Sequence, residues 1–231
     1  MNQVLREEKK FLISMQEAAG ISHRLVQVMQ EDPHNGMHGY RIRSLYFDSI
    51  DDRDYHEKNA GVELRRKLRL RCYDPEADYA LLEMKQKQGA NQRKRSLRLS
   101  RADAQRLVRG DDAPLLSCPE PFAAECYAVM HHYCYRPKTI VEYNRRAFIA
   151  KENRIRITFD SRIVSTESCF ELFSPQLNMN PVLDPYAVVL EVKYNGFMLS
   201  YLRELINSAD RSELSVSKYI LARQNGYQSR L

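Results

Sequence analysis

The stretch VELRRKLRLRCY, residues 62–73, decides the fold that we expect for this chain. Because side chains alternate between the two faces of a β-strand, every second residue shares a face. Four cations therefore lie on one face: Arg65, Lys67, Arg69 and Arg71. The other face is apolar except at Arg66. Neighbouring cations repel one another, so the charged face needs either solvent or a bound anion to stabilise it.

Composition bounds the size of the domain and the kind of partner. At 231 residues the chain is long enough for one domain with a substantial core, and we expect a single domain over residues 1–231. The net charge of +6 and the pI of about 9.0 favour a polyanionic partner. Arginine supplies 25 of the 36 cations. Its planar fork of donors fits phosphate and carboxylate groups, so the sequence favours recognition of oxyanions.

Several classes of protein are disfavoured. The five cysteines are odd in number and form no C-x-x-C pair, which argues for a reducing compartment and against disulfides or a zinc site. No segment resembles a signal peptide or a membrane span, so we expect a soluble, cytoplasmic protein. The chain has no glycine-rich phosphate loop and no internal repeat.

Periodicity and capping residues predict alternating strands and helices. Ser14 with Glu17 forms a capping box, and Ser100 with Asp103 caps a second helix. The expected strands cover residues 6–13, 40–48, 62–73, 80–87, 93–99, 139–149, 154–160 and 186–194. The expected helices cover residues 14–30, 100–109, 122–133 and 198–206, with a short helical start after residue 48 and a last helix that begins near Ser215. A proline-marked connection covers residues 113–121.

The charged faces of these strands carry the functional inference. Taken alone, each strand is typical of a half-solvated antiparallel sheet. Together, at least five strands carry Arg or Lys at alternate positions, interspersed with Glu8, Glu83 and Glu191. If the sheet closes, these faces line a basic tunnel that a triphosphate with a divalent cation would neutralise. We therefore expect an α+β fold: a closed antiparallel β-barrel tunnel with helices packed outside.

Nine short motifs occur in the order found in a known family. They are E-x-K-F at 8–11, LYFD at 45–48, KLRLR at 67–71, LEMK at 82–85, KR at 94–95, Y-x-R at 143–145, RITFD at 156–160, LEVK at 190–193 and SKY at 217–219. From about residue 6 to residue 224 the chain resembles the VTC domain, named for the vacuolar transporter chaperone complex, of the triphosphate tunnel metalloenzyme superfamily. Each motif alone is weak, but their common order is specific.

The resemblance implies a set of site residues. Those that would bind and position the reacting phosphates are Arg69, Arg71, Lys85, Arg145, Arg156 and Lys218. Further phosphate ligands would be Lys10, Lys94, Tyr143, Lys193 and Ser217. Glu191 would hold Mn²⁺ or Mg²⁺, with Glu8 and Glu83 as weaker candidates for the outer shell of the metal. Lys67 and Arg154 share the charged faces by periodicity and rank lower.

The implied activity is a metal-dependent polyphosphate polymerase that transfers the γ-phosphoryl group of ATP to a growing polyphosphate chain. A tripolyphosphate or nucleoside triphosphate hydrolase and a non-catalytic polyphosphate-binding module stay open as alternatives. Residues 8–10, E-K-K, keep only part of the Glu-x-Glu-x-Lys signature of the triphosphatase and adenylate cyclase branches, which disfavours those branches. Nucleic acid is disfavoured as a partner because Tyr143 is almost the only aromatic residue on the charged faces.

Overall fold

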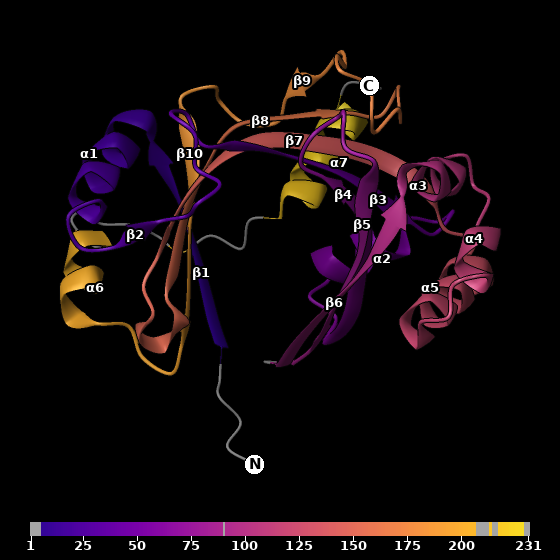
Figure 1. Ribbon diagram of the computed structural model, residues 1–231, viewed down its shortest axis with the longest axis horizontal. Helices are drawn as coiled ribbons and strands as arrows, with labels where there is room; N and C mark the ends of the chain where they lie inside the picture. The colour runs from indigo at the N-terminus through magenta and orange to yellow at the C-terminus, as the bar shows by residue number, and fades with distance from the viewer. Residues whose placement is uncertain (1–5, 90, 207–212, 214–216, 229–231) are drawn as a thin grey trace. The chain divides into compact units, whose positions relative to one another are not determined.

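The computed structural model describes residues 6–89, 91–206, 213 and 217–228, and it confirms an α+β class with a mostly antiparallel sheet (Figure 1). Tertiary contacts divide the chain into two compact units. Unit 1 contains Met1–Arg41, Tyr143–Ile163 and Leu183–Ser217, and unit 2 contains Ile42–Glu142, Val164–Val182 and Lys218–Leu231.

The elements follow the expected order with small shifts at their ends. The strands are β1 (Arg6–Ser14), β2 (Gln30–Glu31), β3 (Tyr40–Asp48), β4 (Leu64–Cys72), β5 (Tyr79–Gln88), β6 (Asn91–Ser100), β7 (Arg136–Ile149), β8 (Arg156–Thr166), β9 (Asn180–Pro181) and β10 (Ala187–Asn195). The helices are α1 (Met15–Leu25), α2 (Arg53–Asn59), α3 (Arg101–Val108), α4 (Ala113–Leu116), α5 (Pro121–His132), α6 (Ser200–Ile206) and α7 (Lys218–Gln228), with a 3₁₀ turn at Glu152–Arg154.

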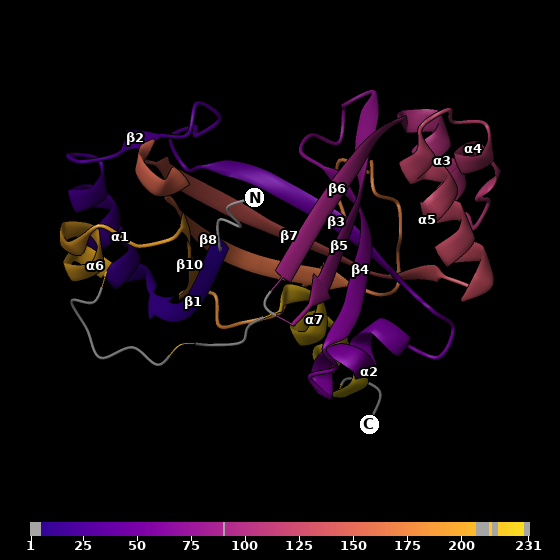
Figure 2. The same cartoon turned by 90° about the horizontal axis from the view of Figure 1, so that it is seen from below.

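In unit 1 the strands β1, β10 and β8 pair antiparallel in that order. Alternation along each strand divides apolar from charged residues, as the sequence predicted. The apolar face packs against α1 and α6, which lie on the same side of β1 and β10 (Figures 1 and 2), and Leu25, Phe159, Leu190 and Leu202 are buried in this core. The opposite face carries the charged residues Glu8, Lys10, Arg156, Asp160, Glu191 and Lys193.

The predicted capping box of α1 is confirmed. The Ser14 hydroxyl accepts a hydrogen bond from the Glu17 amide at 3.1 Å, and the Glu17 carboxylate accepts one from the Ser14 amide at 2.8 Å. The helix ends at Leu25 and not near residue 30. The reason lies in the sheet, because residues 30–31 form β2 and pair with β7.

In unit 2 the strands run in the order β3-β4-β5-β6, all antiparallel. Their apolar faces bury Leu68, Leu82, Met84 and Leu97 in a core that includes residues of α3, α4 and α5. These helices lie on one side of the strands (Figures 1 and 2). The cationic face of β4 that was predicted from residues 62–73 is therefore opposite the core.

Three expectations differ from the structure. The strand order runs from β1 to β6, and among the described residues no pairing closes it into the predicted barrel. The strand expected at 154–160 begins at Arg156, because Asn153 and Arg154 adopt positive φ in a 3₁₀ turn. The connection at 113–121 contains the short helix α4, whose Pro114 sits in the first turn, where its missing N–H costs nothing.

The last helix starts at Lys218. Its expected start near Ser215 lies outside the described residues. Within the described ranges, every helix is too short or too polar to cross a lipid bilayer.

Candidate functional site

On β1 and β10 two carboxylates and two lysines form a compact ion-pair network in unit 1. The antiparallel register places Lys10 opposite Glu191 and Glu8 opposite Lys193. Lys10 Nζ lies 2.9 Å from Glu8 Oε1, and Lys193 Nζ lies 2.9 Å from Glu191 Oε1. These two short pairs join residues on the same strand, and the two directly opposite pairs across the strands are longer, at 3.9 Å each. Opposite charges on facing strands stabilise this pairing.

Burial and neighbouring charges set the ionisation of this network. Burial by itself would raise the pKa of Glu8, but the charges of Lys10 and Lys193 outweigh this effect, so the pKa of Glu8 falls below its ordinary value. Burial by itself would lower the pKa of Lys10, but Glu191 and Glu8 raise it above its ordinary value. Both groups are therefore charged at neutral pH.

Arg145 on β7 is held by a carboxylate that sequence reasoning did not assign to the site. Its Nε and Nη2 donate to the two oxygens of Asp160 at 2.7 Å each, and Nη2 also lies 3.4 Å from Glu191. Burial by itself would lower the pKa of Arg145, but the Asp160 carboxylate raises the pKa of Arg145 well above its ordinary value. Tyr143 is buried, with its ring centroid 5.4 Å from the Arg145 guanidinium. The unit 1 face, as we call it, comprises Glu8, Lys10, Tyr143, Arg145, Asp160, Glu191 and Lys193.

Arg156 lies beside this face on β8, opposite Lys193. Its Nη2 donates to Asp32 Oδ2 at 2.7 Å and to the Tyr40 hydroxyl at 3.0 Å. Burial raises the pKa of Asp32, but hydrogen bonds from His34 and the charge of Arg156 lower it below the ordinary value. Arg156 thus has an ionised internal partner, as Arg145 has.

In unit 2 a single buried carboxylate holds three cations. Arg69 Nη2 lies 2.7 Å from Glu83 Oε2, Arg71 Nε lies 3.7 Å from the same oxygen, and Lys94 Nζ pairs with Oε1. Burial opposes the charge of Glu83, but Arg69 and Arg71, with Lys94, lower its pKa to about 2. Glu83, which the sequence suggested for the outer shell of a metal, is instead the counterion of this cluster.

The strand register of unit 2 aligns more positive charge beside Glu83. Lys67 pairs with Lys85, and Lys85 pairs with Lys94, so three lysines form a row across β4, β5 and β6. Like charges directly opposite one another are destabilising. Five cations thus share this face with Glu83, and three of them contact it. We call Lys67, Arg69, Arg71, Glu83, Lys85 and Lys94 the unit 2 face.

Two further side chains orient the arginines of the unit 2 face. Arg69 Nη1 donates to the Tyr46 hydroxyl at 3.1 Å, and Arg71 Nε donates to Ser44 Oγ at 3.4 Å. Tyr46 and Ser44 alternate along β3 and stand opposite Arg69 and Arg71 in the register. The signal in the sequence was the alternation of polar residues in YRIRSLYFD, but only the register shows which arginine each one meets.

The expected ligands Ser217 and Lys218 lie at the start of α7 and are half-buried. Their neighbour Tyr219 fixes this end of the helix, because its hydroxyl donates to the buried Asp48 carboxylate. The Tyr219 ring stacks on Tyr46 with a centroid distance of 5.2 Å, and Lys67 Nζ lies 6.0 Å from the same ring.

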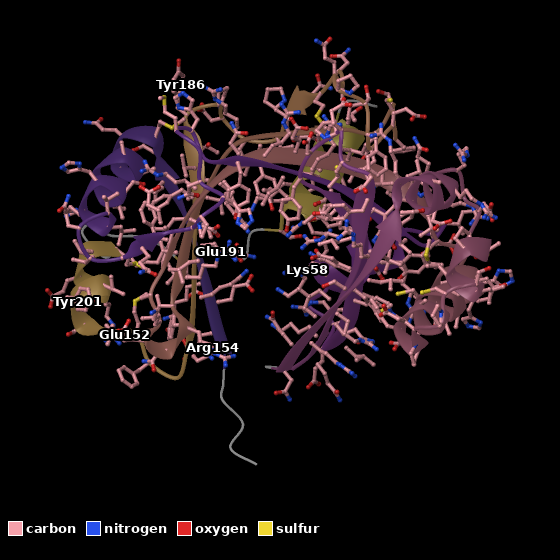
Figure 3. The ribbon with its side chains drawn as sticks, viewed as in Figure 1. Lys58, Glu152, Arg154, Tyr186, Glu191 and Tyr201 are labelled. Atoms are coloured by element: carbon pink, nitrogen blue, oxygen red, sulfur yellow. The ribbon has the colours of Figure 1, made fainter. Side chains whose placement is uncertain are left out.

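The expected residues thus fall into groups. Unit 1 brings together Lys10, Tyr143, Arg145, Glu191 and Lys193, with Arg156 beside them. Unit 2 brings together Lys67, Arg69, Arg71, Lys85 and Lys94. Arg154 does not join the unit 1 face: it is exposed in the turn next to Glu152, away from Glu191 (Figure 3).

Few carboxylates are available to bind the expected metal ion. In the described part of the chain, no three His, Cys, Asp or Glu side chains gather as a metal site of protein ligands alone would require. Glu191 is the expected ligand, and the hydroxyl of Thr158, directly opposite it in the register, is buried without a hydrogen-bond partner among the described residues. Carboxylate and hydroxyl oxygens suit a hard divalent cation that takes its remaining ligands from water and substrate phosphates.

Comparisons with known proteins bear on the fold and the family. A protein from Bacillus halodurans, provisionally described as an adenylate cyclase, has a TM-score of 0.50 at 13% identity, with 92% of this chain and 95% of that chain covered. A protein from Pyrococcus horikoshii covers 95% of this chain and 99% of its own, with a TM-score of 0.47 at 10% identity. No curated protein matches. The model of the VTC domain matches residues 5–227, which span both units. The arginines and lysines of the two faces lie at alternate positions along their strands. The chain therefore belongs to the VTC domain family.

Proposed function

We propose that this protein is a polyphosphate polymerase that transfers the γ-phosphoryl group of ATP to the end of a polyphosphate chain. The supporting observation is the unit 2 face, where three cations share the buried carboxylate of Glu83 and two more lysines lie beside them in the strand register. A multiply charged phosphate chain would relieve the repulsion between the cations. The treatment of residues 1–231 as one domain belongs to this proposal.

The reaction asks the protein mainly for positioning and for positive charge. In phosphoryl transfer, negative charge is spread over the equatorial oxygens of the transferred group, so fixed guanidinium and ammonium groups lower the barrier. Arg69 and Arg71 are held in place by Glu83, and Arg145 is held by Asp160. Each of these arginines therefore has a fixed orientation before a phosphate binds. The acceptor is a terminal phosphate oxygen that is already ionised, so no side chain has to act as a general base.

A divalent cation would supply further charge neutralisation at the transferred phosphate. Glu191, with the Thr158 hydroxyl opposite it, would hold Mn²⁺ or Mg²⁺. Because Glu191 also contacts Lys193 and Arg145, the cation would compete with these two side chains for the carboxylate, and phosphates would strengthen its binding by pairing with both of them. Charge balance favours this exchange, since the phosphates replace the carboxylate as their partner.

The test is to incubate the purified protein with ATP and Mn²⁺ and to separate the products by size. A ladder of lengthening, acid-labile phosphate chains together with ADP is the expected result. Orthophosphate without chain growth would favour the hydrolase, and binding of ATP without turnover would favour a non-catalytic module. Either outcome would overturn the polymerase proposal.

A matched pair of variants tests the metal carboxylate. Glu191→Gln should abolish metal-dependent turnover but leave much of the affinity for tripolyphosphate, because the phosphate-binding cations stay. Glu152→Gln changes an exposed glutamate of the same unit and should behave like the wild type (Figure 3). Full activity of Glu191→Gln would refute the assignment of the metal to this residue.

A further inference from the structure

Thr158 is a buried residue of β8 whose hydroxyl has no hydrogen-bond partner among the described residues. The side chain is 3% exposed, and its Oγ1 atom makes no hydrogen bond. Its neighbours Ile157 and Phe159 point into the apolar core of unit 1, so Thr158 lies on the opposite, charged face. A buried hydroxyl without a partner lowers stability, because the loss of its hydrogen bonds to water is not compensated within the fold. Valine, which has nearly the same shape, would avoid this cost.

Thr139, a second buried threonine, has a hydroxyl that is hydrogen-bonded within the fold. Thr139 is also fully buried, and its hydroxyl donates to the carbonyl oxygen of Thr166 at 3.2 Å. A hydroxyl that is satisfied within the fold needs no ligand. The hydroxyl of Thr158 differs, because its hydrogen-bonding capacity is left for a group that the chain does not supply.

The position of Thr158 identifies the kind of group. It is the direct cross-strand partner of Glu191, and Lys10 faces Glu191 from the other side, so the three residues form one row across β1, β10 and β8. Side chains directly opposite on paired strands have Cβ atoms about 4.5–5.5 Å apart. The Oγ1 atom is thus close enough to share a ligand with the Glu191 carboxylate.

The carboxylates of this face balance its cations. Asp160 lies two residues along the same face of β8, and Glu8, Asp160 and Glu191 pair with Lys10, Arg145 and Lys193. A hydroxyl offers lone pairs as well as a proton, and hard divalent cations take hydroxyl and carboxylate oxygens together.

We propose that the Thr158 hydroxyl and the Glu191 carboxylate together bind the divalent cation. This inference rests on the proposed function in that it takes Glu191 as the metal carboxylate. It adds a second protein ligand, and it explains why a hydroxyl is buried at an energetic cost opposite that carboxylate.

The test compares Thr158→Val with Thr158→Ser and Thr139→Val. Binding of Mn²⁺ is measured without nucleotide from the loss of the free Mn²⁺ signal in electron paramagnetic resonance, and thermal unfolding is measured without metal. Thr158→Val should weaken Mn²⁺ binding at least about tenfold, as loss of a metal-site partner does. Its melting temperature without metal should equal or exceed that of the wild type, because the uncompensated hydroxyl is gone.

The two other variants make the result specific. Thr158→Ser keeps the hydroxyl and should bind Mn²⁺ nearly as the wild type does, which also covers the case in which the valine variant fails to fold. Thr139→Val should lower the melting temperature and leave Mn²⁺ binding unchanged, because its hydroxyl is bonded within the fold.

Three outcomes would overturn the inference. The first is binding of Mn²⁺ by Thr158→Val at the wild-type level while Glu191→Gln loses it, which would leave the proposed function intact. A clear loss of stability in Thr158→Val without metal would mean that the hydroxyl has a partner within the fold. Absence of Mn²⁺ binding by the wild type would also refute it, and the polymerase would then still be judged separately by its products with ATP.

Discussion

Replacing Glu83 by glutamine should lower the free energy of unfolding. It should also increase the stabilisation that a bound anion provides. Glu83 is 2% exposed and is the shared partner of Arg69, Arg71 and Lys94. Its pKa is lowered from 4.5 to about 2. At 1.36 kcal/mol for each pKa unit, the ionised carboxylate contributes about 3 kcal/mol to stability at neutral pH.

The sign of the pH dependence follows from the direction of this shift. A carboxyl with a depressed pKa in the folded state stabilises the protein above its unfolded pKa, and this stability is lost as the pH falls through the folded value. The wild type should therefore lose about 3 kcal/mol between about pH 5 and pH 2 through Glu83 alone. Glu83→Gln should lack that contribution at every pH, so its deficit should be greatest at pH 7 and should vanish near pH 2.

Urea unfolding from pH 7 to pH 2.5, with and without tripolyphosphate, measures both effects. Tripolyphosphate should stabilise Glu83→Gln more than the wild type, because the ligand no longer competes with the carboxylate for the cations. Glu76→Gln, at an exposed position of the turn between β4 and β5, serves as the control and should change neither quantity. Equal stability of Glu83→Gln and the wild type at pH 7 would refute the reasoning.

Three further predictions concern binding, pH dependence and backbone geometry. Arg69→Ala should weaken tripolyphosphate binding by about 1.5–3 kcal/mol in calorimetry, the range for hydrogen bonds to charged groups; an unchanged affinity would remove Arg69 from the site. Burial raises the pKa of Asp54 to about 8, so the folded state holds a proton that the unfolded state releases near pH 3.8. The wild type should lose stability in urea unfolding as the pH rises from 5 toward about 8, and Asp54→Asn should show a flatter profile; parallel profiles would contradict this. Gly39→Ala should destabilise the protein more than Gly61→Ala in thermal unfolding, since both have positive φ but only at Gly39 would a Cβ atom lie 2.3 Å from the Arg145 carbonyl oxygen; equal losses would mean that backbone strain alone matters.

The periodicity of the sequence predicted most strands and their charged faces because side-chain alternation is a local property. The stretch at 62–73 became β4 with Leu68 and Leu70 buried and its cations on the other face, as expected, although Leu64 at its start is exposed. The capping boxes predicted the starts of α1 and α3 for the same reason, since their hydrogen bonds join residues three positions apart.

The counterions of the site could not be predicted in this way. Asp160 stands 15 residues from Arg145, and Asp32 stands 124 residues from Arg156. Each pair depends on which strands are neighbours and on their register, which the local pattern does not contain. The pairing of Glu83 could not be predicted for the same reason, since its sequence position did not show that Arg69 is its direct cross-strand partner.

The turn before β8 shows a different limit. Alternation placed Arg154 on the face of Arg156, but the backbone at Asn153 and Arg154 has positive φ, which interrupts the strand. Asparagine adopts this conformation readily, so the E-N-R sequence at 152–154 held a signal for a turn that the regular alternation after it obscured.

The internal carboxylates have a consequence for which anions the protein retains. An incoming phosphate must compete with Glu83 for Arg69 and with Asp160 for Arg145, so a lone orthophosphate gains little from displacing either one. On the proposed function, linked phosphates would pair with several cations of one face in a single binding event, so the loss of translational freedom would be incurred only once. The internal carboxylates would therefore select linked phosphates over orthophosphate.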